Sequence, residues 1–163
     1  MMMNFNETEK FKKAKESAQN FYKTIGQVYC PYLKEEVSFN AKGLDHIKLH
    51  GWNKARPLKE QYVRLRLLEL APKIIKESHT LQEIYETKSF ERQRINSRWE
   101  RKFVGVQYYG FVAVIKGVRI KIIVKRIVGG ECYFWSIIPF WKPKRDSSGN
   151  KIKNLHEGDL ENQ

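Results

Sequence analysis

Several polar residues of this chain have the chemical character that RNA cleavage without a metal ion requires. That reaction needs a base for the ribose 2′-hydroxyl, cations for the charge that develops on the phosphate, and an acid for the leaving oxygen. His46 and Glu100 are candidate bases. Arg98 and Lys125 are candidate phosphate ligands, and Ser136 can donate a hydrogen bond to a phosphate oxygen. These five residues form the predicted catalytic set.

Further cationic and aromatic residues would bind the RNA chain itself. Cations attract the phosphates, and aromatic rings stack on unpaired bases for about 1–3 kcal/mol per base. Because stacking needs bases outside a duplex, this composition favours single-stranded RNA over duplex DNA. The candidate RNA-binding residues are Tyr108, Lys121, Arg119, Phe134, Arg66 and Arg94.

A histidine pair raises the question of a metal site. His46 and His50 lie four residues apart, beside Asp45, and would share one face of a helix. The familiar zinc helix carries a catalytic glutamate, which this pair lacks, and no third ligand is evident. We therefore expect neither a metal nor a cofactor, and we assign His46 to catalysis or phosphate contact.

The charge of the chain indicates a polyanionic partner. Lysine and arginine number 31 against 18 acidic residues, a formal net charge of +13. RNA is the first candidate and an anionic membrane the second, with a merely soluble basic protein as the alternative. No apolar run approaches the roughly 18 residues that cross a bilayer, and the N-terminus lacks the apolar segment of a secretory signal. We expect a cytoplasmic protein without membrane contact, with Cys30 and Cys132 as reduced core thiols.

Helical spacing of apolar residues dominates the first half of the chain. An amphipathic helix is predicted over residues 4–25, inside an N-terminal segment 1–29 that precedes a single domain over 30–141. Within that domain a short strand is predicted near 37–39. Further helical segments are predicted at about 44–49, from Pro57 and from Pro72. A last short helix is predicted over 80–87, because Thr80 and Glu83 form a capping pair. Residues 142–163 are polar and predicted to form a loose tail.

Strand-like alternation of β-branched and aromatic residues dominates from about residue 95. Strands are predicted over 97–104, 108–115, 118–128 and 131–139. Lys116-Gly117 and Gly129-Gly130 each suit a two-residue hairpin turn. Because helices come first and strands second, the predicted fold is α+β, with N-terminal helices packed on one face of a four-stranded antiparallel sheet.

The two hairpin turns predict which side chains share a face of this sheet. In that register Val124 faces Trp135, and both belong to an apolar face that the helices cover. Trp99 and Phe103 are placed on the same apolar side. The opposite, mixed face then holds Arg98, Glu100, Tyr108, Arg119, Lys121, Lys125, Phe134 and Ser136. An ordinary solvated sheet face is the alternative interpretation of this pattern.

Two basic segments remain open to more than one interpretation. Arg64 and Arg66 lie two residues apart, so one of them would point toward the sheet and the other to solvent. The segment 88–98 is either a phosphate-contacting loop or a solvated linker.

Three segments, CPYLKEEVSFNAKGLDHIKLH, SHTLQEIYETKSFERQRINSRWE and YFWSIIPFW, together resemble an uncharacterised family of small bacterial and phage proteins over about residues 30–141. The layout also resembles the barnase–EndoU–colicin–RelE-like nuclease superfamily. That resemblance implies metal-independent RNA cleavage on an open sheet face, supporting His46 and Ser136 first and Arg98 and Lys125 next. It also implies a toxin or phage effector with a protein inhibitor or antitoxin as a partner.

Three hypotheses for function follow. The first is a metal-independent endoribonuclease that cleaves single-stranded RNA by 2′-hydroxyl attack. The second is a non-catalytic RNA-binding module that uses the same face. The third is a DNA-binding regulator, for which the helix around Arg64 and Arg66 is the sole candidate for a recognition helix.

Overall fold

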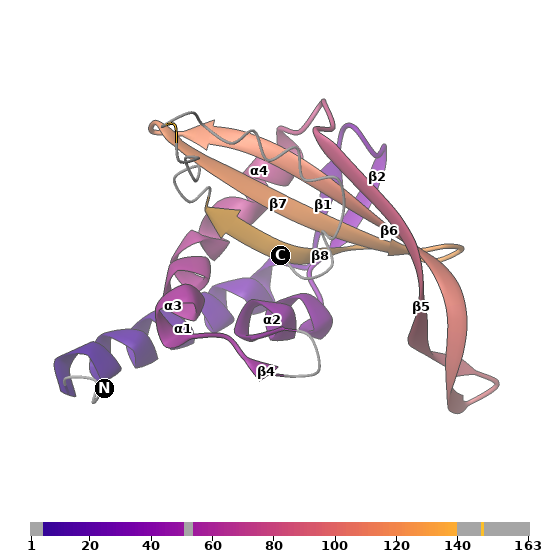
Figure 1. Cartoon of the computed structure of the whole chain (residues 1–163), viewed down its shortest axis with the longest axis horizontal. Coiled ribbons are helices and arrows are strands. Elements are labelled where there is room, and N and C mark those ends of the chain that lie inside the picture. The colour runs from indigo at the N-terminus through magenta and orange to yellow at the C-terminus, as the bar shows by residue number, and fades with distance from the viewer. Residues whose placement is uncertain (1–4, 51–53, 140–147, 149–163) are drawn as a thin grey trace.

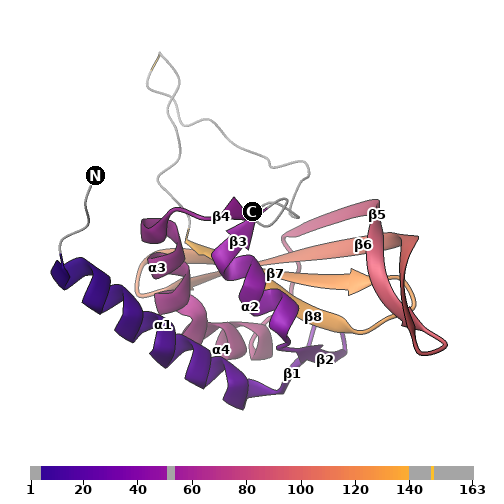
Figure 2. The ribbon, with the colours of Figure 1, turned by 90° about the horizontal axis from the view of Figure 1, so that it is seen from below.

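Helices occupy the first half of the chain and a sheet most of the second, so the predicted α+β class is confirmed. The computed structural model describes residues 5–50, 54–139 and 148. The predicted tail over 142–163 lies outside the described residues, apart from position 148. Figures 1 and 2 show the helices gathered at one side of a twisted, curved sheet.

The predicted N-terminal helix is confirmed, and it buries Ala18 and Tyr22 in the same core as the rest of the fold. Pro57 precedes the third α-helix and Pro72 lies in the first turn of the fourth, where a proline ring and its missing N–H are tolerated. None of the described helices is long and apolar enough to cross a membrane. The helical elements are α1 (Phe5–Ile25), α2 (Ala41–Lys48), α3 (Leu58–Leu67), the 3-10 helix η1 (Leu68–Leu70) and α4 (Ala71–Lys76).

The main sheet has six strands and is mixed, which corrects the predicted four-stranded antiparallel sheet. Its order is β1-β2-β8-β7-β6-β5, with β2 parallel to β8 and the other neighbours antiparallel. The predicted strands 97–104 and 108–115 form one continuous strand, β6, whereas β1, β2 and β5 are not among the four strands predicted for the sheet. β1 and β2 have four residues each, too short for alternation to predict them both. The strands are β1 (Gln27–Cys30), β2 (Glu35–Ser38), β5 (Glu83–Ile95), β6 (Arg98–Ile115), β7 (Val118–Ile127) and β8 (Cys132–Pro139), while β3 (Leu49–His50) and β4 (Lys54–Ala55) pair separately.

The segment 80–87, predicted as a short helix, leads into a strand instead. β5 pairs with β6 along its whole length, so the basic segment 88–98 belongs to a hairpin and is not a loop. The Thr80–Glu83 pair resembles a helix cap, but half-buried and exposed residues alternate along β5 with the period of a strand. A tight turn at Asn96-Ser97, where both residues have positive φ, closes the hairpin. Pairing with β6 therefore outweighs the capping signal.

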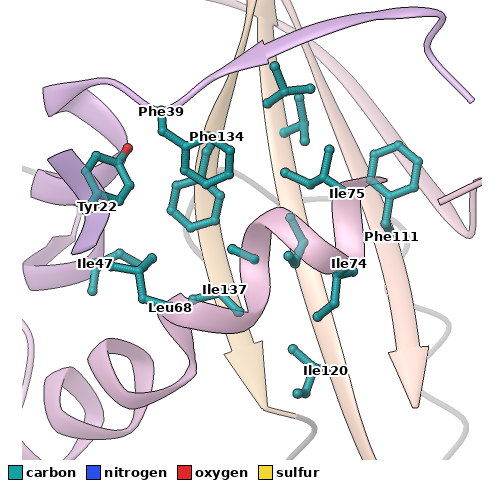
Figure 3. Packing of buried hydrophobic residues seen from close by; sticks show 14 of the residues in the cluster. Tyr22, Phe39, Ile47, Leu68, Ile74, Ile75, Phe111, Ile120, Phe134 and Ile137 are labelled. Carbon is teal, nitrogen blue, oxygen red and sulfur yellow. The ribbon is translucent and has the colours of Figure 1, made fainter. Parts of the chain in front are cut away.

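The main hydrophobic core lies between the helices and one side of the sheet, which we call the first face. Figure 3 shows Phe134 of β8 against Phe39, with Tyr22 of α1 beside them. The Phe39 and Phe134 rings are stacked with centroids 5.0 Å apart. Cys30 and Cys132 are free thiols buried in this core, as predicted.

Part of the predicted register is confirmed. β6 and β7 pair as expected, and Ile122 of β7 lies opposite Ile137 of β8. A bulge at Trp135 then shifts the pairing by one residue toward the β7–β8 turn, so the predicted two-residue turn at Gly129-Gly130 is wrong. Phe134 consequently faces the helices and Trp135 packs on the opposite side, which we call the second face. The faces predicted for these two residues are therefore reversed.

The outer half of the β5–β6 hairpin extends away from the helices and past the end of β8 (Figures 1 and 2). β7 pairs with β6 only as far as Val106, so residues 98–105 of β6 pair with β5 alone. Trp99 and Phe103 lie on the side of β6 that was predicted for them, but they lie beyond the helices and are exposed. The expectation that they join the core is wrong because none of the helices that the structure describes reaches this part of the hairpin.

Candidate functional site

The candidate site lies along the part of β8 beyond Tyr133, a local edge of the sheet that β2 does not pair with, where side chains from α2 and α3 meet the second face. A small hydrophobic cluster forms the floor of this face, and Lys121 and Lys125 of β7 are buried beside it. The cluster consists of Val106, Tyr108, Ile123 and Ile138, with Tyr85, Val104 and Trp135 packed against it.

Three charged residues at four-residue spacing bring positive charge to this edge. Arg56 precedes α3, and Glu60 and Arg64 lie on successive turns of it. Arg56 Nη1 lies 3.1 Å and Arg64 Nη2 2.7 Å from the same oxygen, Glu60 Oε1. The two arginine side chains are only 3% and 4% exposed. Two buried guanidinium groups therefore share one carboxylate oxygen.

His46 lies in the last turn of α2 and joins this arrangement through Arg56. Arg56 Nε donates to the His46 backbone carbonyl at 3.0 Å, and Arg56 Nη2 lies 3.1 Å from His46 Nε2. A guanidinium can only donate, so Nε2 is the acceptor and carries no proton in this arrangement. The imidazole thus presents a nitrogen that is able to take up a proton.

Gly43 lets α2 approach β8 closely enough to place His46. A Cβ atom at this position would lie 2.2 Å from the backbone oxygen of Phe134 and 2.8 Å from the Tyr22 hydroxyl. Asn40 caps the same helix by accepting a hydrogen bond from the Gly43 backbone N–H. The position of His46 therefore depends on a glycine three residues earlier in the chain.

Trp135 and Ser136 connect the helices to β8. The Trp135 ring stacks on the His46 imidazole with centroids 4.1 Å apart. Arg64 Nη1 donates to Ser136 Oγ at 2.7 Å, although Arg64 belongs to α3. Lys125 Nζ lies 4.3 Å from the centroid of the Trp135 ring. We call this group, comprising His46, Arg56, Glu60, Arg64, Lys125, Trp135 and Ser136, the cationic cluster.

The two buried lysines of the second face each bind a carboxylate of β5. Lys125 Nζ lies 2.7 Å from Glu91 Oε1, and Lys121 Nζ lies 3.1 Å from Glu83 Oε2. Lys125 also lies over the Tyr108 ring, 5.5 Å from its centroid. The Tyr108 and Trp135 contacts therefore hold the Lys125 ammonium group beside two aromatic rings.

Burial makes the positive charge of this cluster costly. Burial and repulsion from Arg64 lower the pKa of Arg56 to about 10, against the attraction of Glu60. Burial also lowers the pKa of Arg64. For Glu60, burial acts to raise the carboxyl pKa, but the hydrogen bonds and charges of the two arginines outweigh it and lower the pKa overall. A second anion beside these arginines would reduce their mutual repulsion.

A further feature of the cluster is a buried donor atom of Arg64. Arg64 Nε is buried and has no hydrogen-bond partner among the described residues. Buried guanidinium donors normally find acceptors, since an unmet one costs about 1–3 kcal/mol. Arg64 therefore keeps one buried donor that no described group uses.

The structure brings four of the residues predicted from sequence together. His46, Lys125 and Ser136 belong to the cationic cluster, and Tyr108 lies below Lys125 on the second face. Lys121 lies on the same face of β7, bound to Glu83. These residues are far apart in sequence and meet because β7 and β8 are neighbours that α2 and α3 adjoin.

The other predicted site residues lie elsewhere. Arg98 and Glu100 have the alternation of the second face but are exposed and stand roughly 25–35 Å along β6 from Tyr108, at about 3.3 Å per residue. Arg119 lies opposite Val114, close to the β6–β7 turn, and is exposed there. Three further residues lie away from the second face: Phe134 in the main core, Arg66 in a groove between α1 and α3, and Arg94 on the other side of the β5–β6 hairpin.

Four residues of the cationic cluster, Arg56, Glu60, Arg64 and Trp135, were not among the site residues predicted from the sequence. The arginine and glutamate residues repeat at positions i, i+4 and i+8, a spacing that places them on one helical side and was a usable signal. Of the pair Arg64 and Arg66, Arg66 was the one predicted to bind RNA, but its guanidinium lies over the Tyr62 ring. Trp135 had no such signal, because its position depends on the bulge in β8.

Comparison with other proteins adds no assignment. No protein-family model matches this sequence, and neither a curated protein nor a solved structure is significantly similar to the chain. Among the described residues, no group of three or more His, Cys, Asp or Glu side chains is arranged to hold a metal ion.

Proposed function

We propose that this protein is a metal-independent endoribonuclease that cleaves single-stranded RNA at the cationic cluster. The observation that carries the proposal is the continuous hydrogen-bond chain from Ser136 through Arg64, Glu60 and Arg56 to His46. It links a proton-accepting imidazole to two buried cations and a hydroxyl. A base and cations for the developing phosphate charge are two of the requirements of phosphodiester cleavage by 2′-hydroxyl attack, and water can serve as the acid.

In the proposed reaction, Arg56, Arg64 and Lys125 hold the scissile phosphate and stabilise its developing charge. Ser136 Oγ donates a hydrogen bond to a phosphate oxygen. The ribose 2′-hydroxyl displaces the Arg56 hydrogen bond at His46 Nε2 and gives its proton to that nitrogen. The 2′-oxygen bonds to phosphorus and the bond to the 5′-oxygen breaks. A water molecule protonates the departing 5′-oxygen, and the hydroxide so formed takes the proton from His46, which leaves a 2′,3′-cyclic phosphate, a 5′-hydroxyl end and a neutral imidazole.

The surroundings of the cluster support RNA as the substrate. The partly exposed Trp135 ring lies beside Lys125, so a base next to the held phosphate has an aromatic surface within reach. The formal net charge of +13 attracts a polyanion to the protein as a whole. A toxin role with an inhibitor protein, which the sequence resemblance implies, belongs to the same proposal and would require the inhibitor to cover this edge of the sheet.

The test is incubation of the pure protein with mixed-sequence single-stranded RNA in EDTA. We expect products with 2′,3′-cyclic phosphate ends, and a loss of at least about 100-fold in rate for His46→Ala and Lys125→Met. His79→Ala is the matched control, because His79 is exposed and distant from the cluster. Thermal unfolding of each variant distinguishes loss of chemistry from loss of fold. Intact RNA at all protein concentrations would refute the cleavage proposal.

A non-catalytic RNA-binding module is the second candidate, and the burial of His46, which is 8% exposed, favours it. Such a module would bind RNA with a steep salt dependence and leave it intact. A DNA-binding regulator receives less support, because Arg64 of the only candidate recognition helix is buried against β8. A preference for duplex DNA over single-stranded RNA would reverse that order.

A further inference from the structure

The outer half of the β5–β6 hairpin is a two-stranded ribbon with one unusual side. The ribbon consists of residues 88–95 and 98–105, which pair with each other and with no other described strand. Side chains of one side alternate with those of the other. The side that continues the first face beyond the helices, here called the outer face, carries Lys88, Phe90, Arg92, Arg94, Trp99, Arg101 and Phe103.

Three aromatic rings of this outer face are exposed to an unusual degree. Phe90, Phe103 and Trp99 are 69%, 57% and 61% exposed. Phe90 and Phe103 are cross-strand partners whose ring centroids lie 5.0 Å apart. Trp99 lies four residues along the strand from Phe103, about 13 Å at 3.3 Å per residue, so two separate stacking positions are available. Neither the helices nor another strand covers them among the described residues.

The same face is purely cationic between its rings. Lys88, Arg92, Arg94 and Arg101 are all exposed, and no carboxylate lies among them on this side of the ribbon. The acidic residues of the ribbon, Glu91 and Glu100, alternate onto the opposite side, where Glu91 binds Lys125. Arg92 lies over the Trp99 ring at 5.4 Å, so cations and rings are interleaved.

The ribbon bends so that this face lies on its convex side. Tyr85, Tyr108 and Lys125 are neighbours across three strands, yet Lys125 reaches Glu91, six residues farther along β5. A straight strand would separate those positions by roughly 20 Å, more than a lysine side chain spans. The hairpin therefore curves over the second face, and its outer face points away from the cationic cluster.

Protection of an exposed strand does not account for this composition. Charged side chains alone suffice to prevent edge-to-edge pairing, and exposed aromatic rings act against that purpose. Rings interleaved with cations are what single-stranded nucleic acid binding uses, because every base has a face to stack and every phosphate a charge to neutralise.

We propose that the outer face of the β5–β6 ribbon is a binding surface for single-stranded RNA, separate from the cationic cluster. Bases stack on Phe90 with Phe103 and on Trp99, while the four cations contact phosphates on either side. The inference rests on the proposed function only for the choice of RNA as the polyanion. It adds a strand-holding surface that anchors RNA at a distance from the point of cleavage.

Fluorescence anisotropy with a labelled single-stranded RNA in EDTA tests the surface directly. We use His46→Ala as the background so that cleavage does not intervene. Phe90→Ala and Trp99→Ala should each raise Kd at least about fivefold, the equivalent of 1 kcal/mol of stacking. Trp99→Phe should retain binding, because a ring is kept. Tyr29→Ala, an exposed ring on β1, is the control and should leave Kd unchanged. Equal Kd values for all variants would overturn the inference.

The charges provide an independent readout. Arg92→Gln combined with Arg101→Gln should reduce the slope of log K against log salt by about 1.4, since each phosphate contact contributes about 0.7 for a single strand. Lys102→Gln, on the opposite side of the ribbon, should change the slope much less. Tighter binding of duplex DNA or of an acidic protein than of single-stranded RNA would also overturn the inference.

Cleavage of a dinucleotide separates this inference from the proposed function. A dinucleotide at the cationic cluster is too short to reach the outer face of the ribbon, so variants of that face should cleave it at the wild-type rate. If no variant cleaves any RNA but the ribbon variants bind weakly, the ribonuclease proposal fails and the binding surface stands. If the wild-type protein cleaves RNA and ribbon variants bind it unchanged, only the binding surface fails.

Discussion

Arg64 of α3 donates a 2.7 Å hydrogen bond to Ser136 Oγ of β8, across 72 positions of sequence. Both side chains are buried, and Arg64 also binds Glu60. This contact fastens the helix that carries the arginines to the strand that carries Ser136. The same hydrogen bond therefore contributes to the stability of the fold and holds Arg64 and Ser136 in position in the proposed site.

The Arg64–Ser136 pair should show a measurable coupling energy. We expect Ser136→Ala, Arg64→Met and the double variant to give a coupling of about 1.5–3 kcal/mol in a double-mutant cycle, the range for a hydrogen bond to a charged group. Urea unfolding with a common m-value is the measurement. Additive effects within about 0.5 kcal/mol would mean that the two residues do not stabilise each other.

Replacing Glu60 should expose the repulsion between the two arginines. We expect Glu60→Gln to lower the free energy of unfolding by about 1–2 kcal/mol, a reduced value because the Glu60 side chain is 30% exposed. Inorganic phosphate should stabilise this variant more than it stabilises Glu69→Gln, a control at an exposed position of η1. Thermal unfolding with and without phosphate measures both effects, and equal stabilisation of the two variants would contradict an anion site at the arginines.

The pH dependence of stability should reveal the same carboxylate. The pKa of Glu60 is lower in the folded protein than its ordinary value of about 4.3, so the unfolded chain binds more protons near that pH. Glu60 therefore contributes stability above the unfolded pKa, and that contribution is lost as pH falls through the folded pKa. The difference in unfolding free energy between wild type and Glu60→Gln should shrink from about pH 6 toward about pH 3, a range that brackets the ordinary carboxyl pKa. A difference that stays constant over this window in urea titrations would exclude the ion-pair explanation.

Gly43 should affect the site through packing alone. We expect Gly43→Ala to cost about 1–3 kcal/mol, because the added methyl group would overlap the Phe134 carbonyl oxygen and α2 must move away from β8. RNA cleavage should fall with it, since His46 moves together with the helix. Lys42→Ala is the control, at an exposed position of the same turn. Unfolding and cleavage assays on the two variants check this, and a fully active Gly43→Ala protein would show that His46 does not need the close approach.

The parts of the fold that were predicted are those governed by local chemistry. The long N-terminal helix follows from apolar spacing, and the β6–β7 register follows from a Lys116-Gly117 turn whose residues both have positive φ. The predictions failed where two local signals competed. The Thr80–Glu83 pair resembles a helix cap, yet the alternation that follows it pairs with β6 along thirteen positions.

The candidate site was likewise predicted only in part, and the predicted part is again the one that local signals indicate. His46 was selected by chemical type, and Lys125 and Ser136 by chemical type and by alternation along strands; the three lie in one cluster. Arg98 and Glu100 were selected by the same criteria of chemical type and alternation, yet they lie far along the hairpin. Alternation tells which side of a strand a residue occupies, but it carries no information on the distance between residues along that strand.

The sequence by itself determined the α+β class, the basic charge and the alternation that separates the two faces of β6 and β7. These properties depend on neighbours within a few residues, so local rules suffice for them. Only the tertiary structure decided that a bulge turns Trp135 toward His46, and that Arg64 rather than Arg66 meets β8. Both outcomes depend on how α2 and α3 pack against the sheet, and packing energies couple residues that no sequence pattern relates.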